Sequence, residues 1–304
     1  MILAVIDIGT NTFNLLIANR ITKEIVYKDK QPVQLGKGGI SKGFIATDAE
    51  ERAIQTLLLY KSKIEQYENV ETQVIATSAV RNANNREEFI KNIYAQTGFE
   101  IHVISGMVEA EGIHQGVTNC LALTEDAELI LDIGGGSIEF IIANSEQPLW
   151  MKSLEIGGQR LMDQFHNQDP IANSDILKLN SFLEKTLDEV LNECKRHNVK
   201  SLIGSAGSFD TLQDMGKAAD AIDETESHLL PVDYFQSICA ELTVKPREER
   251  LIIPGMIALR VDMIVVATLL IKYIVDSLGI ETIRVSSYSL KEGILFGNLE
   301  IAQF

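Results

Sequence analysis

One segment of this chain occurs twice, at positions far apart. Residues 5–18 read VIDIGTNTFNLLIA, and residues 130–143 read ILDIGGGSIEFIIA. In both copies an apolar run ends in Asp-Ile-Gly, and a short turn leads into a second apolar run. This pattern predicts two strands joined by a tight turn. Its repetition at such a distance indicates a duplicated domain, with two similar hairpins facing each other across a cleft.

The second hairpin has a glycine turn of the kind that binds phosphate. Gly134, Gly135 and Gly136 let successive backbone N–H groups point at one place, and no Cβ atom bars a close ligand. Asp132 ends the strand before the turn, where a carboxylate could hold a divalent cation beside that phosphate. Glu139 lies within the following strand between apolar neighbours, where a carboxylate is costly without a partner. A structural hairpin with an exposed acid is the simpler alternative.

The first hairpin carries polar groups at its tip. Thr10, Asn11 and Thr12 stand where the second copy has Gly135, Gly136 and Ser137. Their hydroxyl and amide groups could hydrogen-bond to phosphate oxygens, although such residues also occur in turns for their geometry alone. The duplication favours the phosphate-binding interpretation.

Length and charge limit the protein's class. A chain of 304 residues suits two domains, which we place at residues 1–125 and 126–304. Hydrophobic residues make up 45% of the chain, which supports packed globular domains. A formal net charge of −16 argues against a general nucleic-acid or anionic-membrane partner, because both require basic patches.

The sequence favours a cytoplasmic protein. Its three cysteines are widely spaced and form no C-x-x-C motif, so we expect reduced thiols: Cys120, Cys194 and Cys239. No secretory signal is expected, since Asp7 interrupts the first apolar stretch. The apolar region 251–274 contains charged residues and predicts a buried helix rather than a membrane span.

Two further candidates lie in the first half. Arg81 follows a predicted strand at residues 72–76, at the sheet edge where α/β proteins bind ligands, and its guanidinium could bind a phosphate. Ser105 predicts the N-cap of a helix that places Glu109 in its first turn. Glu109 there either complements the helix dipole or acts as a general base that activates water.

In the second half, a strand-to-helix loop offers another phosphate site. A short strand ends in GSAGSF, whose candidate residues are Gly204, Ser205, Gly207 and Ser208. This loop is neither a P-loop nor a dinucleotide fingerprint. A long amphipathic helix is predicted at residues 175–197. A last strand-to-helix junction carries Ser286, Ser289 and Lys291, which could also line the cleft.

The motifs, taken in order, resemble those of the exopolyphosphatase/guanosine pentaphosphatase family, within the actin-like, sugar kinase and Hsp70 superfamily. The matching segments are DIGTNTFNLLIA, TSAVRNANN, ISGMVEAEGIHQGV, LDIGGGSIEF, GSAGSF, REERLIIPG and SSYSLKEGIL. They extend over nearly the whole chain and correspond to the short, two-domain form of the family. The resemblance implies an α/β fold of two duplicated actin-like, ribonuclease H-like domains around a cleft.

The resemblance also implies roles for individual residues. Glu109 corresponds to the expected general base, while Asp132 and Glu139 correspond to acids associated with metal binding and the attacking water. Asp7 is a further metal candidate, and Mg²⁺ or another divalent cation is the expected cofactor. The expected phosphate-binding residues are Arg81, Thr10, Asn11, Thr12, Gly134, Gly135, Gly136, Ser137, Ser205, Gly207 and Ser208.

Three residues depart from the family pattern. Val108 replaces the first Glu of E-E-A, an acid that we interpret mainly as a helix cap. Ile138 replaces a Thr and removes one hydroxyl from the hairpin. Lys291 replaces the usual Arg, so the positive charge is kept but the bidentate geometry is lost.

The sequence therefore predicts a metal-assisted hydrolase that releases terminal phosphate from inorganic polyphosphate. Hydrolysis of guanosine pentaphosphate or of a short polyphosphate is the alternative within the enzymes. A weakly active sensor that binds polyphosphate or a nucleotide is the alternative outside them. A homodimer is expected from the resemblance alone.

Overall fold

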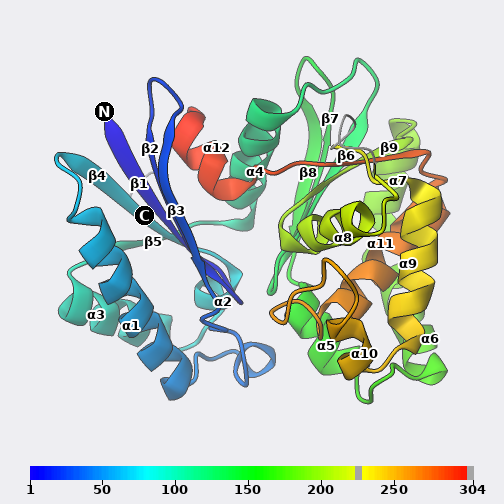
Figure 1. Cartoon of the computed structure of the whole chain (residues 1–304), viewed down its shortest axis with the longest axis horizontal. Helices are drawn as coiled ribbons and strands as arrows, with labels where there is room; N and C mark the ends of the chain where they lie inside the picture. The colour runs from blue at the N-terminus through cyan, green and yellow to red at the C-terminus, as the bar shows by residue number, and fades with distance from the viewer. Residues whose placement is uncertain (223–227, 300–304) are drawn as a thin grey trace.

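The computed structural model describes residues 1–222 and 228–299. These residues form two five-stranded sheets, with helices packed around and between them (Figure 1). The first sheet has the order β3-β2-β1-β4-β5 and contains β1 (Ile2–Ile8), β2 (Phe13–Asn19), β3 (Ile25–Gln31), β4 (Val70–Ala76) and β5 (Ile101–Val103). The second has the order β10-β9-β6-β7-β8 and contains β6 (Glu128–Ile133), β7 (Ile138–Ala143), β8 (Pro148–Leu154), β9 (Ser201–Ser205) and β10 (Thr282–Val285).

The two sheets have the same topology. In the first sheet β1, β2 and β3 pair antiparallel, while β4 and β5 continue the sheet parallel to β1. In the second sheet β6, β7 and β8 pair antiparallel, and β9 and β10 continue it parallel to β6. This equivalence confirms the predicted duplicated α/β fold.

Each sheet has a hydrophobic core with its own helices. The helices that follow the first sheet's strands are η1 (Ile40–Lys42), α1 (Thr47–Ile64), α2 (Ser78–Arg81), α3 (Arg86–Thr97) and α4 (Gly106–Cys120). Those of the second half are α5 (Gly158–Phe165), α6 (Asn173–Thr186), α7 (Asp188–Arg196), α8 (Gly207–Ala218), α9 (Val232–Val244), α10 (Arg247–Leu251), α11 (Ile264–Leu278) and α12 (Leu290–Phe296). Helices α1 and α3 supply buried side chains to one core, and α6, α7, α9 and α11 supply the other. These cores hold the sheets rigid and thereby fix the strand ends that form the site.

A third core lies between the two sheets, where α4 and α12 pack together (Figure 1). The two helices meet at glycines, because a Cβ on Gly116 or Gly293 would overlap the backbone of the opposite helix. Helix α12 follows the second sheet in sequence, yet it packs against β1 of the first sheet. The domain boundary near residue 125 stays a prediction, and α12 links the two halves.

Two predicted helices differ from those in the structure. The expected helix at residues 175–197 is two helices, because the chain bends at the fully buried Leu187, between α6 and α7. The expected helix across the apolar region 251–274 begins only at Ile264. Pro254 and Gly255 interrupt the helical pattern before it, and Gly255 adopts a φ of +86° against the backbone of Asp214.

None of the helices within the described ranges, 1–222 and 228–299, has the length and apolar character needed to cross a membrane.

Candidate active site

The tips of the two hairpins lie against each other. In the first, the Gly9 N–H donates to the Thr12 carbonyl over 3.1 Å. A Cβ on Gly9 would lie 2.8 Å from that carbonyl, and a Cβ on Gly134 would lie 3.0 Å from the carbonyl of Ser137, so the turns have the same geometry. A Cβ on Gly135 would lie 2.9 Å from the Asn11 amide, which leaves no room for another residue type. The two copies of the sequence repeat therefore form similar turns that pack against each other, one from each half of the chain.

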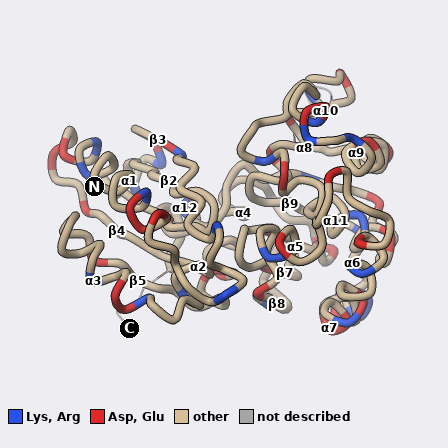
Figure 2. Tube along the Cα trace, turned by 90° about the horizontal axis from the view of Figure 1, so that it is seen from below, with Lys and Arg blue, Asp and Glu red and all other residues tan. Residues whose placement is uncertain are grey.

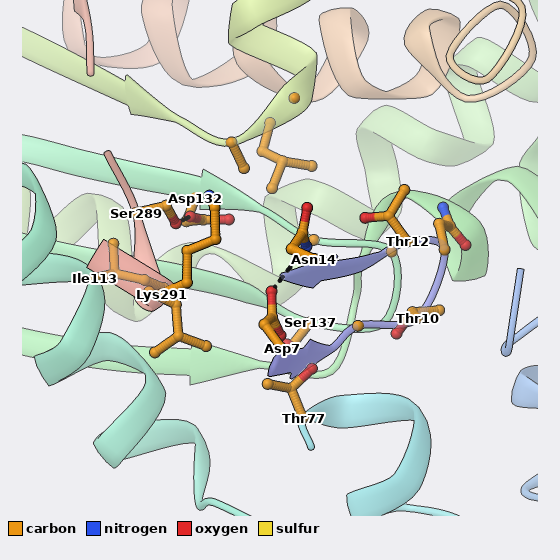
Figure 3. Close-up of a pocket in the computed structure, with 18 of the residues that line it drawn as sticks. Asp7, Thr10, Thr12, Asn14, Thr77, Ile113, Asp132, Ser137, Ser289 and Lys291 are labelled. Atoms are coloured by element: carbon orange, nitrogen blue, oxygen red, sulfur yellow. Dashed lines mark hydrogen bonds between the residues drawn. The ribbon is translucent and has the colours of Figure 1, made fainter. Parts of the chain in front are cut away.

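Aspartates end the first strand of each hairpin and face the same pocket (Figure 3). The Asn14 amide donates to Asp7 Oδ2 over 3.0 Å. Burial raises the pKa of Asp7 to about 6, although Lys291 acts in the opposite direction. A buried carboxylate that has a raised pKa and no ion pair within the described residues is a site where a cation would be favourable.

Asp132 is held by two hydroxyl groups. Ser205 Oγ and Ser289 Oγ donate to its Oδ2 over 2.9 and 2.5 Å. Burial nevertheless raises the pKa of the Asp132 carboxyl. Ser289 also caps α12 through a capping box with Glu292, so the end of that helix fixes the position of Asp132.

Glu109 enters the pocket from the first turn of α4. Ser105 Oγ caps this helix by accepting the Val108 N–H over 3.2 Å, as the sequence predicted. Arg81 Nη1 donates to Glu109 Oε2 over 2.8 Å. Burial raises the pKa of Glu109 to about 7 despite the nearby Arg81. This combination suits a general base, since its pKa is near neutrality and its orientation is fixed.

Glu139 is fully buried beside these groups. It pairs with Asp132 in the β6–β7 register, and Ser153 Oγ donates to its Oε1 over 2.7 Å. Burial, Glu109 and Asp132 together raise the pKa of Glu139 well above its ordinary value. Like charges placed directly opposite each other are destabilising, so this pair indicates a functional rather than a structural arrangement.

The pocket between the halves has a volume of about 130 Å³. Of the predicted site residues, those that line it are Asp7, Thr10, Asn11, Thr12, Glu109, Asp132, Gly134, Gly135, Gly136, Ser137 and Gly207. Those outside its lining are Arg81, Glu139, Ser205 and Ser208. Three of these four contact or pair with a lining carboxylate, and Ser208 follows Gly207. The individual roles of all these residues stay predictions.

Sequence reasoning missed the charged residues at the other side of the pocket. Lys30, Asp210 and Arg260 line it together with the predicted Lys291. Burial and the nearby Arg260 together lower the pKa of Lys30 to about 8, although Asp210 acts in the opposite direction. Arg260 is itself buried, and its Nε has no hydrogen-bond partner within the described part of the chain. Lys30 in β3 and Arg260 in an irregular segment are isolated charges with no sequence pattern around them, whereas Asp210 lies in the first turn of α8, directly after the predicted GSAGSF loop.

The carboxylates fit a divalent cation by their chemistry. Asp7 and Asp132 present oxygen atoms to the pocket, and Mg²⁺ is commonly bound by one or two carboxylates together with water and substrate phosphates. Within residues 1–222 and 228–299, no three acidic, His or Cys side chains converge into a complete metal-binding group. A cation at this site would therefore need oxygen ligands from water or substrate.

Comparisons with known proteins agree with this geometry. The chain is 31% identical, over 98% of its length, to a bifunctional 3-dehydroquinate synthase/phosphatase of Fusobacterium nucleatum, of which it covers 46%. It is 26% identical over 97% of its length to a guanosine-5'-triphosphate,3'-diphosphate pyrophosphatase of Pseudoalteromonas translucida, of which it covers 59%. The chain thus spans about half the length of these curated relatives.

A solved structure extends the agreement to the whole fold. An exopolyphosphatase from Cytophaga hutchinsonii superposes with a TM-score of 0.91 at 38% sequence identity, covering 97% of this chain and 96% of that one. The architecture of two five-stranded sheets with their helices is therefore shared over nearly the whole chain. Residues 17–302 match the Ppx/GppA phosphatase family, to which this chain belongs.

Proposed function

We propose that the protein is a phosphoanhydride hydrolase that releases terminal phosphate from inorganic polyphosphate. One observation carries this proposal: Glu109 lines the same pocket as the turns of the two hairpins, residues 9–12 and 134–137. The pKa of Glu109 is raised, and Arg81 fixes the position of its carboxylate. The Cytophaga hutchinsonii protein, which is described as an exopolyphosphatase, supports the substrate class.

In this proposal the two turns bind the terminal phosphoryl group. The backbone N–H groups of residues 134–137 and the hydroxyls of Thr10 and Thr12 stabilise the charge on its oxygens. Glu109 accepts a proton from a water molecule as the water oxygen bonds to the terminal phosphorus. The bridging P–O bond breaks, and its electron pair stays with the shortened chain as a phosphate terminus.

We assign the cation to the aspartates of the two hairpins. Asp132 and Asp7 would hold Mg²⁺ from the pocket side, with Glu139 beside Asp132; the resemblance associates Asp132 and Glu139 with metal binding and makes Asp7 a further candidate. When bound, the ion would neutralise charge on the phosphoryl oxygens. Lys291 and Arg260 supply further positive charge at the same pocket.

Separate observations favour a short phosphorylated substrate over long polyphosphate. The tips of both hairpins line one pocket, so a short phosphorylated ligand can place its terminal phosphate there. The net charge of −16 gives no general attraction for a long polyanion, and Figure 2 shows acidic residues spread over both halves of the molecule among the basic ones. The pyrophosphatase relative from Pseudoalteromonas translucida makes guanosine pentaphosphate the natural alternative, along with short polyphosphates.

The experiment compares phosphate release from long polyphosphate, tripolyphosphate and guanosine pentaphosphate in the presence of Mg²⁺. Glu109→Gln serves as the control because it keeps the shape of the side chain and removes the base. Release that depends on Glu109 supports the hydrolase, and the substrate with the largest kcat/KM identifies its preference. Thermal stabilisation by these ligands without release supports a phosphate-binding sensor and contradicts the hydrolase.

Two further properties belong to the proposal. We infer a cytoplasmic protein, supported by three free cysteines of which Cys194 and Cys239 are buried. We also infer a homodimer from the family resemblance, which light scattering of the purified chain tests directly.

A further inference from the structure

Glu155 joins the two halves of the molecule at one point beside the active site. It lies between β8 and α5 of the second half, but its carboxylate contacts α2 of the first. Arg81 Nη2 and Nε donate to Glu155 Oε1 over 2.8 and 3.2 Å, and Ser78 Oγ donates to Glu155 Oε2. No sequence motif singled out this glutamate.

The backbone around Glu155 is fixed to the glycine hairpin. The Gly157 N–H donates to the carbonyl of Gly136 over 3.0 Å, and the Gly158 N–H donates to the carbonyl of Gly134 over 2.8 Å. A Cβ on Gly157 would overlap the backbone of Gly135. Glu155 therefore moves with the hairpin that we propose binds phosphate.

The partners of Arg81 leave little of its guanidinium free. Glu155 occupies Nε and Nη2, while Glu109 Oε2 and the Ile104 carbonyl accept from Nη1 over 2.8 and 3.0 Å. Each guanidinium nitrogen is thus already engaged. A phosphoryl group can form a bidentate hydrogen-bonded pair with Nε and Nη2 of Arg81 only if it replaces Glu155.

Neighbouring contacts close the same edge of the molecule. Arg160 Nη1 donates to the Ile40 carbonyl over 3.2 Å, and Ser41 Oγ donates to Asp163 Oδ2 over 2.8 Å. In Figure 1 α5 lies toward the lower edge of the molecule and α4 and α12 toward its upper edge, with α2 between them. The halves are thus joined by packed helices at one end and by polar contacts at the other, which is the arrangement expected of a hinged cleft.

We propose that Glu155 is a positioning residue that acts through Arg81, holding Arg81 and Ser78 across the cleft until a substrate phosphoryl group replaces it. The proposal rests on the proposed function, because it takes the competing ligand to be a phosphate. The Glu155 carboxylate sets the affinity for substrate, whereas Glu109 sets the rate of the chemical step. The contact is partly exposed, with side-chain exposures of 15% for Arg81 and 38% for Glu155, so an anion can displace it.

The test variant is Glu155→Gln, which keeps the side-chain size and removes the charge. KM for tripolyphosphate and Kd for inorganic phosphate are expected to fall by about 2- to 5-fold, since loss of a partly exposed ion pair changes an equilibrium by up to about this factor. The kcat value is expected to change by less than about 2-fold, because the contact between Arg81 and Glu109 remains. Glu155→Asp restores the carboxylate and is expected to return KM toward the wild-type value.

Two variants complete the design. Ser78→Ala removes the second donor to Glu155 and is expected to shift Kd in the same direction but by less. Glu189→Gln is the matched control, because Glu189 forms an ion pair with Lys152 within the second half, away from the cleft. Circular dichroism and thermal unfolding confirm that each variant is folded.

An unchanged or raised Kd for inorganic phosphate in folded Glu155→Gln overturns the proposal. A fall in kcat with KM unchanged overturns it as well, because Glu155 would then act on the chemical step. These results are distinguishable from failure of the proposed function. In that case the wild-type protein releases no phosphate, while the comparison of phosphate Kd values still reports on Glu155.

Discussion

Asp132 and Glu139 lie directly opposite each other in the β6–β7 pairing, and both are buried. At the equivalent place in the first hairpin, Asp7 pairs with Asn14, whose amide donates to it. Both hairpins thus have an aspartate on the first strand, but the residue opposite it is Asn14 in one and Glu139 in the other. One half therefore pairs its aspartate with a neutral amide donor, and the other has two acids that must share protons or a cation.

Replacement of Glu109 by Gln tests its role as the base. Glu109→Gln is expected to reduce kcat for tripolyphosphate by about 10²- to 10⁴-fold, because the amide cannot accept the proton from water. Binding of inorganic phosphate, measured by calorimetry, is expected to stay near the wild-type value. Substantial activity in the folded variant contradicts the assignment of Glu109.

The raised pKa values predict how stability depends on pH in the absence of metal. The folded-state pKa is raised from 3.8 to about 6 for Asp7 and from 4.5 to about 7 for Glu109. The folded protein therefore binds these protons more tightly than the unfolded chain does. The resulting stability is fully present below about pH 4 and is lost as pH rises through about 6 to 7. Urea unfolding in EDTA measures this slope.

The Asp7→Asn variant measures how much the Asp7 carboxyl contributes to the pH dependence of the unfolding free energy. The variant retains an oxygen that can accept from Asn14 but has no proton to exchange, so its stability is expected to fall less steeply between pH 4 and pH 7. Parallel curves for variant and wild type contradict the assignment. Addition of Mg²⁺ at pH 8 is expected to raise the unfolding temperature of the wild type more than that of Asp7→Asn.

The hydroxyl that holds Asp132 is expected to affect catalysis. Ser205→Ala removes the 2.9 Å bond to Asp132 Oδ2 and is expected to lower kcat/KM by about 10-fold, because misplacement of a supporting carboxylate weakens the site. Thr211→Val is the control, since it removes a buried hydroxyl that donates to the Gly207 carbonyl rather than to a carboxylate. Both variants lose about 1 kcal/mol of stability. Equal kinetic effects in the two variants would show that Ser205 has no special role.

Restoring an acid at position 108 separates capping from chemistry. Ser105 already caps α4 through the Val108 N–H, but the reciprocal bond to the Ser105 N–H is missing. Val108→Glu is expected to supply it and to stabilise the protein by about 1 kcal/mol without raising kcat. Thermal unfolding and steady-state kinetics decide, and a large gain in activity without a gain in stability refutes the capping interpretation.

The hairpins could be predicted from the sequence because their determinants are local. Asp132 and its glycine turn depend on neighbouring residues alone, and the duplication provided an independent check. The same holds for Ser105 and Glu109, where an N-cap residue and the helix spacing place the carboxylate in the first turn.

Contacts between distant segments could not be predicted in this way. Glu155 contacts Arg81 only because the connection between β8 and α5 meets α2 across the cleft, and a single glutamate carries no signal of that contact. The return of α12 to the first sheet had a faint signal in Gly112, Gly116 and Gly293, whose missing side chains allow the helices to approach. Glycines occur in helices for many other reasons, so the contact between α4 and α12 could be recognised only from the structure.

The most direct test of the central claim is hydrolysis of tripolyphosphate in ¹⁸O-labelled water with Mg²⁺, followed by mass spectrometry of both products. Attack of water on the terminal phosphorus predicts one labelled oxygen in the released phosphate and none in the pyrophosphate that remains. Glu109→Gln is expected to release almost no labelled phosphate over the same time. Label in the pyrophosphate, or equal release by the variant, would contradict terminal attack with Glu109 as the base.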